Sequence, residues 1–157
     1  MTVRVELTLN GRRRTLEVEP GEFLSDTLRD RLGLSGVKVA CGMGECGACS
    51  VLLDDLAVFS CLTLTAETRG RRVTTVEGLE QGGELSALQR AFADLGAVQC
   101  GYCTPGMLIS ATALLAATPH PDETVVRRAL AGNICRCTGY GKIVAAVLST
   151  SEAGVTS

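Results

Sequence analysis

The stretch CGMGECGACSV at residues 41–51 combines three cysteines with the glycine pattern Gly42-x-Gly44-x-x-Gly47. Glycines at this spacing occur in dinucleotide-binding loops, and they also allow a loop to wrap a metal closely. A dinucleotide-binding fingerprint follows a strand and opens a helix. Here a cysteine interrupts the pattern, and the next residues, SVLLDD, have the composition of a strand. The context therefore favours a loop that wraps a metal.

The spacing of the first four cysteines points to an iron–sulfur cluster. They follow the pattern C-x4-C-x2-C-x11-C, and its opening C-x4-C-x2-C is that of plant-type ferredoxins, which bind a 2Fe–2S cluster. Three thiolates on one short loop must converge on two irons while backbone N–H groups turn toward the sulfurs. Glycines permit the positive φ angles that such a loop needs. The predicted ligands of this first set are Cys41, Cys46, Cys49 and Cys61.

The second set of cysteines is Cys100-x2-Cys103 followed by Cys135-x-Cys137. Both pairs lie next to predicted helix ends, and the N–H groups of a helix N-terminus favour thiolate. A structural zinc is the alternative, but it is bound by two separated C-x2-C pairs, from which the C-x-C pair departs. Spacing alone favours an iron–sulfur cluster and leaves zinc open.

Composition excludes several classes of protein. Eight cysteines allow a disulfide framework, but the N-terminus has no apolar core of a signal peptide, and a bridge within Cys135-x-Cys137 would be strained. We therefore expect a cytoplasmic protein with metal-binding cysteines. The net charge of −2 and the 3% of aromatic residues argue against a nucleic-acid partner. No apolar run is long enough to span a membrane.

The first half of the chain, residues 1–78, predicts a small α+β domain. Val3 to Leu9 alternate in polarity, Asn10-Gly11 is typical of a hairpin turn, and the alternation resumes through Val18. A short helix is expected where Leu24, Leu28 and Leu32 recur before Gly33. A second hairpin is predicted over 50–61 with its turn at 54–55, and a last strand over 71–78.

The second half, residues 79–149, predicts four helices, and residues 150–157 a flexible tail. Leu85, Leu88, Phe92 and Leu95 share one helical face in the first of them. The second is expected over 104–117 with Thr104 as its cap and Pro105 at its first position. The third starts at Asp122 and ends before Gly132-Asn133, and the fourth covers 141–150.

Residues 3–148 resemble the small iron–sulfur subunit of the xanthine dehydrogenase family, the molybdenum hydroxylases. The matching stretches are LRDRLGLSGVKVACGMGECGACSVLLDD, SCLTLT, TTVEGL, VQCGYCTPGMLISATALL and RRALAGNICRCTGYGKIVAAV. The resemblance implies that the second set also binds a 2Fe–2S cluster. It further implies a β-grasp, ferredoxin-like N-terminal domain and a four-helix C-terminal domain.

The resemblance also implies a role in a larger oxidoreductase. In this family a large subunit binds the molybdopterin cofactor and a medium subunit binds FAD, and we expect both as separate chains in a dimer of heterotrimers. The second set would receive electrons from molybdenum and the first would pass them toward FAD. Gln99 and Cys137 match the positions that contact the pterin. No substrate site is expected on this chain.

Two other functions remain open at the level of sequence. A stand-alone ferredoxin or redox sensor would use the same clusters without partners, and a zinc-stapled interaction module would use the cysteines without redox chemistry. Apolar surface left exposed on each domain would favour the subunit. His120, the one histidine, is predicted to lie in a surface turn. Met43 and Arg136 are candidates for partner contact.

Overall fold

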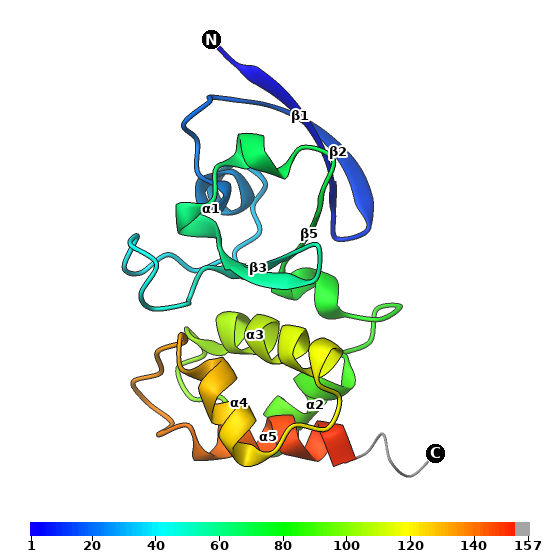
Figure 1. Ribbon diagram of the computed structural model, residues 1–157, viewed down its shortest axis with the longest axis vertical. Coiled ribbons are helices and arrows are strands. Elements are labelled where there is room, and N and C mark those ends of the chain that lie inside the picture. The colour runs from blue at the N-terminus through cyan, green and yellow to red at the C-terminus, as the bar shows by residue number, and fades with distance from the viewer. Residues whose placement is uncertain (153–157) are drawn as a thin grey trace.

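The computed structural model describes residues 1–152, which form a sheet domain (β1 to β5) and a helical domain (α2 to α5). Figure 1 shows the sheet domain above the helical domain, with the long helix α3 lying along the boundary between them. Each domain has its own apolar core. The predicted α+β fold is therefore confirmed.

The sheet domain opens with the predicted hairpin. Strand β1 (Val3–Leu9) pairs antiparallel with β2 (Arg12–Val18) in register from Val3 and Val18 to Leu9 and Arg12. Asn10 and Gly11 both have positive φ, 48° and 76°, as a type I′ turn requires. Val5 and Val18 face the core and are fully buried.

The predicted short helix is present in two parts, α1 (Leu24–Asp26) and the π-helical turn η1 (Thr27–Arg31). Leu24 and Leu28 are buried against the sheet. Gly33, with φ of 69°, follows the helix as its predicted stop. This segment packs against the inner face of the sheet and leads directly into the loop that carries the first cysteines.

Five strands form one mixed sheet in the order β2-β1-β5-β3-β4. Strands β3 (Ser50–Leu53) and β4 (Leu56–Phe59) make the predicted second hairpin, and β5 (Arg72–Thr74) runs parallel to β1 and antiparallel to β3. The predicted β-grasp arrangement is confirmed. The short 3₁₀ helices η2 (Ser60–Leu62) and η3 (Thr65–Thr68) had no sequence signal. The last strand was predicted over 71–78, but it ends at Thr74, and the 3₁₀ helix η4 (Val76–Leu79) takes the end of that segment.

The turn at Asp54–Asp55 also adopts the predicted conformation, with φ of 49° and 75°. Arg71 donates to Asp54 and Arg72 donates to Asp55, at 2.7 and 2.5 Å. Those contacts, together with a hydrogen bond from the Arg72 N–H to Asp54, lower the pKa of Asp54. The two carboxylates stabilise a turn and the start of β5.

All four predicted helices of the helical domain are present. They are α2 (Ala87–Asp94), α3 (Thr104–Ala117), α4 (Glu123–Leu130) and α5 (Gly141–Glu152). Asp122 caps α4 as expected, since its side chain accepts from the N–H of Val125 at 2.8 Å. Phe92, Met107 and Ile143 are among the largest buried side chains of this domain.

Three details differ from the sequence predictions. Leu85 and Leu95 are 50% and 42% exposed because they lie outside α2, so the apolar face of that helix reduces to Leu88 and Phe92. The residue that precedes α3 as its N-cap is Cys103, and Thr104 is already helical. Helix α5 continues to Glu152, into the segment predicted as a tail, while 153–157 lie outside the described residues.

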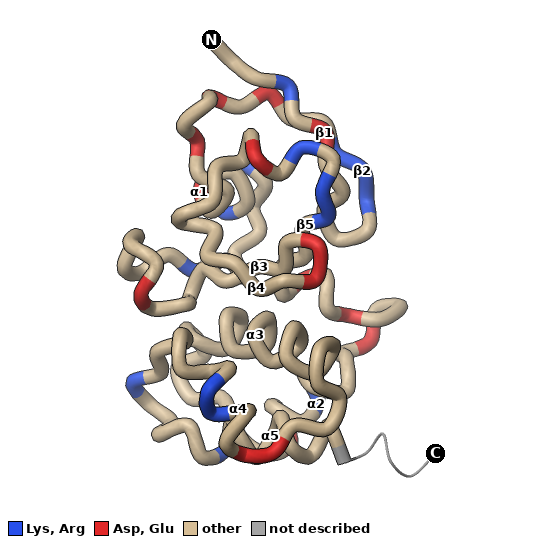
Figure 2. Tube along the Cα trace, in the orientation of Figure 1, with Lys and Arg blue, Asp and Glu red and all other residues tan. Residues whose placement is uncertain are grey.

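The two domains meet through an uncharged surface. Helix α3 packs on β3 and β4, and neither α3 nor β3 contains Lys, Arg, Asp or Glu. Figure 2 shows this boundary free of acidic and basic residues, which gather instead on the hairpins of the sheet domain and at the outer helices. Within residues 1–152, no helix combines the length and apolarity needed to cross a bilayer.

The core of the helical domain gives a direct test of the packing. Phe92 is 1% exposed, so Phe92→Ala should lower the free energy of unfolding of this domain by about 3–5 kcal/mol. Leu95→Ala removes an exposed side chain next to the same helix and should change it by no more than about 0.5 kcal/mol. Urea denaturation followed by circular dichroism measures both. Equal losses of unfolding free energy in the two variants would contradict the structure, in which Phe92 is buried and Leu95 is exposed.

Candidate metal centres

The first set of cysteines lies at the end of the sheet domain that faces the helical domain. Cys41, Cys46 and Cys49 belong to the loop before β3, and Cys61 lies in η2 after β4. Cys49 and Cys61 are buried, whereas Cys41 and Cys46 are partly exposed. The hairpin β3–β4 thus brings Cys61 back to the loop.

The loop adopts the conformation that its glycines predicted. Gly42, Gly44 and Gly47 all have positive φ, 64°, 77° and 69°. The backbone N–H groups of Met43 and Glu45 both donate to the sulfur of Cys41 at 3.4 Å. These hydrogen bonds, with that of Cys46, lower the pKa of Cys41 to about 6. The loop therefore stabilises a thiolate before any metal is considered.

The four sulfurs of the first set lie in two pairs. The thiol of Cys46 hydrogen-bonds to Cys41. Burial, followed by a hydrogen bond with Cys49 and repulsion from it, raises the pKa of Cys61 to about 11. In each pair the two thiols lie close enough to interact, as two ligands of one metal cation must.

The second set joins the start of α3 to the loop between α4 and α5. Cys103 is the N-cap of α3, and Cys100 lies exposed just before it. Cys135 is buried, and its N–H donates to the Tyr140 hydroxyl at 2.9 Å. Tyr140 itself has a φ of 68°, so the backbone after Cys137 is bent sharply back.

This set also forms two pairs. Burial alone would raise the pKa of Cys135, but hydrogen bonds from Thr138 and Cys137 outweigh it and lower the pKa to about 7. Burial, and then hydrogen bonding to Cys135, raises the pKa of Cys103 to about 12. Cys100 and Cys137 form the second pair, with the pKa of Cys100 lowered by the Tyr102 N–H and by Cys137.

The donor sets fit a binuclear cluster. A tetrahedral zinc site needs four side chains that converge on one ion. Among the described residues, no group of three or more Cys, His, Asp or Glu side chains is placed to hold a single metal ion. Two pairs of thiols per set match instead the demand of a 2Fe–2S cluster, in which each iron takes two cysteines.

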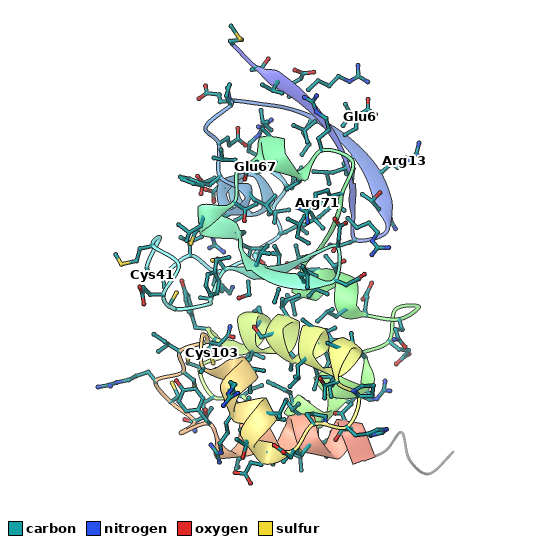
Figure 3. All side chains as sticks on the ribbon, viewed as in Figure 1. Glu6, Arg13, Cys41, Glu67, Arg71 and Cys103 are labelled. Atoms are coloured by element: carbon teal, nitrogen blue, oxygen red, sulfur yellow. The ribbon has the colours of Figure 1, made fainter. Side chains whose placement is uncertain are left out.

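The loops that carry the two sets touch each other. The N–H of Ile134 donates to the carbonyl of Cys46 at 2.9 Å, and the Tyr102 hydroxyl donates to the carbonyl of Val39 at 3.0 Å. Figure 3 shows Cys41 and Cys103 on the same side of the molecule, one above and one below the boundary between the domains. The fold therefore brings together eight cysteines that span residues 41 to 137.

The remaining predicted residues lie at the surface. Gln99 is exposed beside Cys100, at the same end of the helical domain as the exposed Cys137. Met43 and Arg136 are exposed in the two cysteine loops. His120 is exposed in a bend, as expected, and its Nδ1 lies 3.2 Å from the Ser151 carbonyl.

Sequence reasoning missed the residues that support the ligands. Asn133 was interpreted only as a helix stop, yet it is 4% exposed and reaches the first loop. Thr138 and Tyr140 hydrogen-bond to the sulfur and the backbone of Cys135. An asparagine buried two residues before a ligand has no signal in a single sequence, because its partner lies in another domain.

Comparison with protein families matches both halves of the chain. The 2Fe–2S iron–sulfur cluster binding domain family matches residues 7–86, and the [2Fe–2S] binding domain family matches residues 75–148. Together they span both sets of cysteines. Two 2Fe–2S-binding domains are therefore present in this chain.

Individual relatives agree over almost the whole length. The nicotine 6-hydroxylase small subunit of Paenarthrobacter nicotinovorans is 53% identical over 93% of this chain and 88% of its own. The xanthine dehydrogenase iron–sulfur-binding subunit of Escherichia coli O157:H7 is 50% identical over 96% of both chains. Quinoline 2-oxidoreductase from Pseudomonas putida 86 contains a chain that superimposes with a TM-score of 0.93 at 44% identity, covering 98% of this chain and 96% of that one.

Substitutions at two glycines of the first loop test the effect of backbone strain and the effect of steric clash separately. A Cβ at Gly42 would meet nothing within 4 Å, whereas a Cβ at Gly47 would lie 2.4 Å from the Gly132 carbonyl oxygen. Gly42→Ala should therefore lower the free energy of unfolding only by the penalty that a non-glycine residue pays for positive φ, about 1–2 kcal/mol. Gly47→Ala should cost clearly more, because backbone of the other domain must move. Thermal unfolding of the two variants measures the difference, and equal costs would contradict the close approach at Gly47.

Proposed function

This chain belongs to the iron–sulfur subunits of the xanthine dehydrogenase family of molybdenum hydroxylases, and we propose that it relays single electrons between a molybdopterin site and FAD on partner subunits. Its relatives are iron–sulfur and small subunits of such oxidoreductases. Electron transfer is thus the role of the family. In this chain the electrons would pass between the molybdopterin site and FAD through clusters held by its cysteines.

The eight cysteines are the proposed cluster ligands. In the first set, Cys41 and Cys46 would hold one iron and Cys49 and Cys61 the other, as their pairing suggests. In the second set the pairs are Cys103 with Cys135 and Cys100 with Cys137. A 2Fe–2S cluster, when bound, accepts and releases one electron at a potential tuned by nearby hydrogen bonds and exposure. The N–H groups aimed at Cys41 supply such tuning.

The hydrogen bond from Ile134 to Cys46 is the observation that carries the relay. Cys46 belongs to the first set, and Ile134 is bonded directly to Cys135 of the second. One 2.9 Å hydrogen bond thus closes a short path of covalent bonds between the two sets. Two independent redox domains would have no need for their ligand loops to meet.

Exposed apolar side chains around the ligands support partner subunits on both sides. Met43 and Leu62, 66% and 56% exposed, flank the first set. Tyr102 and Ile134, 45% and 57% exposed, flank the second. Large apolar side chains gathered at a functional surface mark protein interfaces. Such leftover apolar surface favours a subunit over a stand-alone ferredoxin.

The order of the two sets along the path is the one that the family resemblance implies. Cys100, Cys137 and Gln99 are all exposed at one end, and we assign this end to the molybdopterin-bearing large subunit, with Gln99 and Cys137 in contact with the pterin. The partly exposed Cys41 lies on the sheet domain, on the opposite side of the domain boundary from Cys103 (Figure 3). We assign that loop to the FAD-bearing medium subunit.

Metal content tests the ligand assignment. The complex recovered with this chain should contain two larger subunits and about four irons per molybdenum, since each cluster holds two irons. Cys61→Ser should remove the first cluster alone and leave about two irons per molybdenum. Cys135→Ser is the reciprocal control. Zinc in place of iron would overturn the assignment, and iron without molybdenum or partners would indicate a stand-alone redox protein.

Partner docking tests the surface assignment. Met43→Lys should weaken binding of the FAD-bearing subunit by about tenfold or more, because a charge at the centre of an apolar contact costs upwards of ~1.4 kcal/mol. Leu56→Lys is the matched control, since Leu56 is equally exposed, at 68%, but lies at the far end of the β3–β4 hairpin. Titration by surface plasmon resonance measures both. Equal effects of the two substitutions, or no effect of Met43→Lys, would contradict the assignment of Met43 to this interface.

A further inference from the structure

Three segments from different parts of the chain converge between the two cysteine sets. They are Gly47 in the first loop, Gly106 in the first turn of α3, and Gly132 with Asn133 after α4. We call this group the junction. Each of its segments lies within three residues of a cysteine, since Cys46, Cys103 and Cys135 are their neighbours in sequence.

Asn133 is the polar centre of the junction. Its side-chain Nδ2 donates to the carbonyl of Gly47 at 3.0 Å, across the boundary between the domains. Its Oδ1 accepts from the Ser110 hydroxyl of α3 at 2.7 Å. Asn133 is only 4% exposed. Because the Ser110 hydroxyl holds the oxygen side of the amide, the nitrogen side is directed at Gly47.

The glycines show how closely the backbones approach. A Cβ at Gly106 would lie 2.3 Å from the Gly47 carbonyl oxygen, and a Cβ at Gly47 would lie 2.5 Å from Nδ2 of Asn133. Neither contact is possible for a residue larger than glycine unless the backbone moves. The first loop therefore rests directly on the start of α3 and on the segment before Cys135, and the Asn133 amide links them.

We propose that Asn133 is a positioning residue that sets the separation and relative orientation of the two clusters. The inference rests on the proposed function, because it takes the eight cysteines as ligands. Gly47 lies between Cys46 and Cys49, and Asn133 lies two residues before Cys135. The amide thus links the two ligand loops at the point where the Ile134 hydrogen bond joins them. The apolar contact of α3 with β3 and β4 holds the domains together, whereas the amide fixes the register of the loops.

A near-isosteric substitution tests this role without removing volume. Asn133→Asp keeps an oxygen for Ser110 but places a second oxygen against the Gly47 carbonyl, so the loops should separate. Asn10→Asp is the matched control, because Asn10 makes an equivalent pair of hydrogen bonds with Thr75 far from both cysteine sets. Both variants are prepared in the full complex and reduced with dithionite.

The readout is the magnetic interaction between the two reduced clusters in low-temperature electron paramagnetic resonance. This interaction splits the signals and depends steeply on the distance and angle between the clusters. Asn133→Asp should narrow or abolish the splitting while iron content stays at the wild-type level. Asn10→Asp should leave the splitting unchanged. Ser110→Ala, which frees the amide to rotate but keeps its donor, should give a smaller change in the same direction.

The possible outcomes separate this inference from the proposed function. Wild-type splitting in an iron-replete Asn133→Asp complex would overturn the positioning role and leave the relay intact. A wild-type protein without iron would overturn both. If Asn133→Asp does not assemble, Ser110→Ala and Asn133→Ala decide. Unchanged splitting in both would overturn the inference, and a graded loss from Ser110→Ala to Asn133→Ala would support it.

Discussion

The contact of the Gly47 carbonyl with Asn133 and with the first turn of α3 is the constraint on which the arrangement of the two cysteine loops depends. An iron–sulfur relay needs two clusters that are near each other and held by separate ligand sets. Here a loop of the sheet domain lies against backbone of the helical domain, at distances that admit no Cβ at Gly47 or Gly106. Packing of α3 on β3 and β4 brings the domains together, and the junction joins the two cysteine loops directly.

Within each set, the chemistry of the thiols follows from local backbone geometry. The N–H groups of Met43 and Glu45 lower the pKa of Cys41, and Thr138 does the same for Cys135. The buried Cys61 and the partly exposed Cys103 have raised pKa values, to about 11 and 12. Each set thus combines a preformed thiolate with a thiol that a cation must deprotonate. Such a donor set is suited to a cationic metal, and its two-plus-two arrangement is suited to two irons.

Much of the fold was predictable because its signals are local. The Asn10–Gly11 turn, the glycines of the cysteine loop and the Asp122 cap each act within a few residues, and each was observed as expected. Predictions were less accurate where tertiary packing decides. Leu85 and Leu95 share a helical period with Leu88 and Phe92, yet they lie beyond the ends of α2 and are exposed. The cap of α3 falls on Cys103, and Thr104 is already the first helical residue.

The sequence by itself indicated the candidate ligands and their grouping into two sets, since cysteine spacing within a loop limits which sulfurs can share a metal. It also determined the two-domain α+β architecture and, by resemblance, the family. Only the tertiary structure decided how the sulfurs pair and that Ile134 meets Cys46. It alone showed that Asn133 bridges the domains to Gly47. The reason is physical: pairing and bridging are contacts between residues up to 88 positions apart, and no local pattern encodes a partner that folding alone brings near.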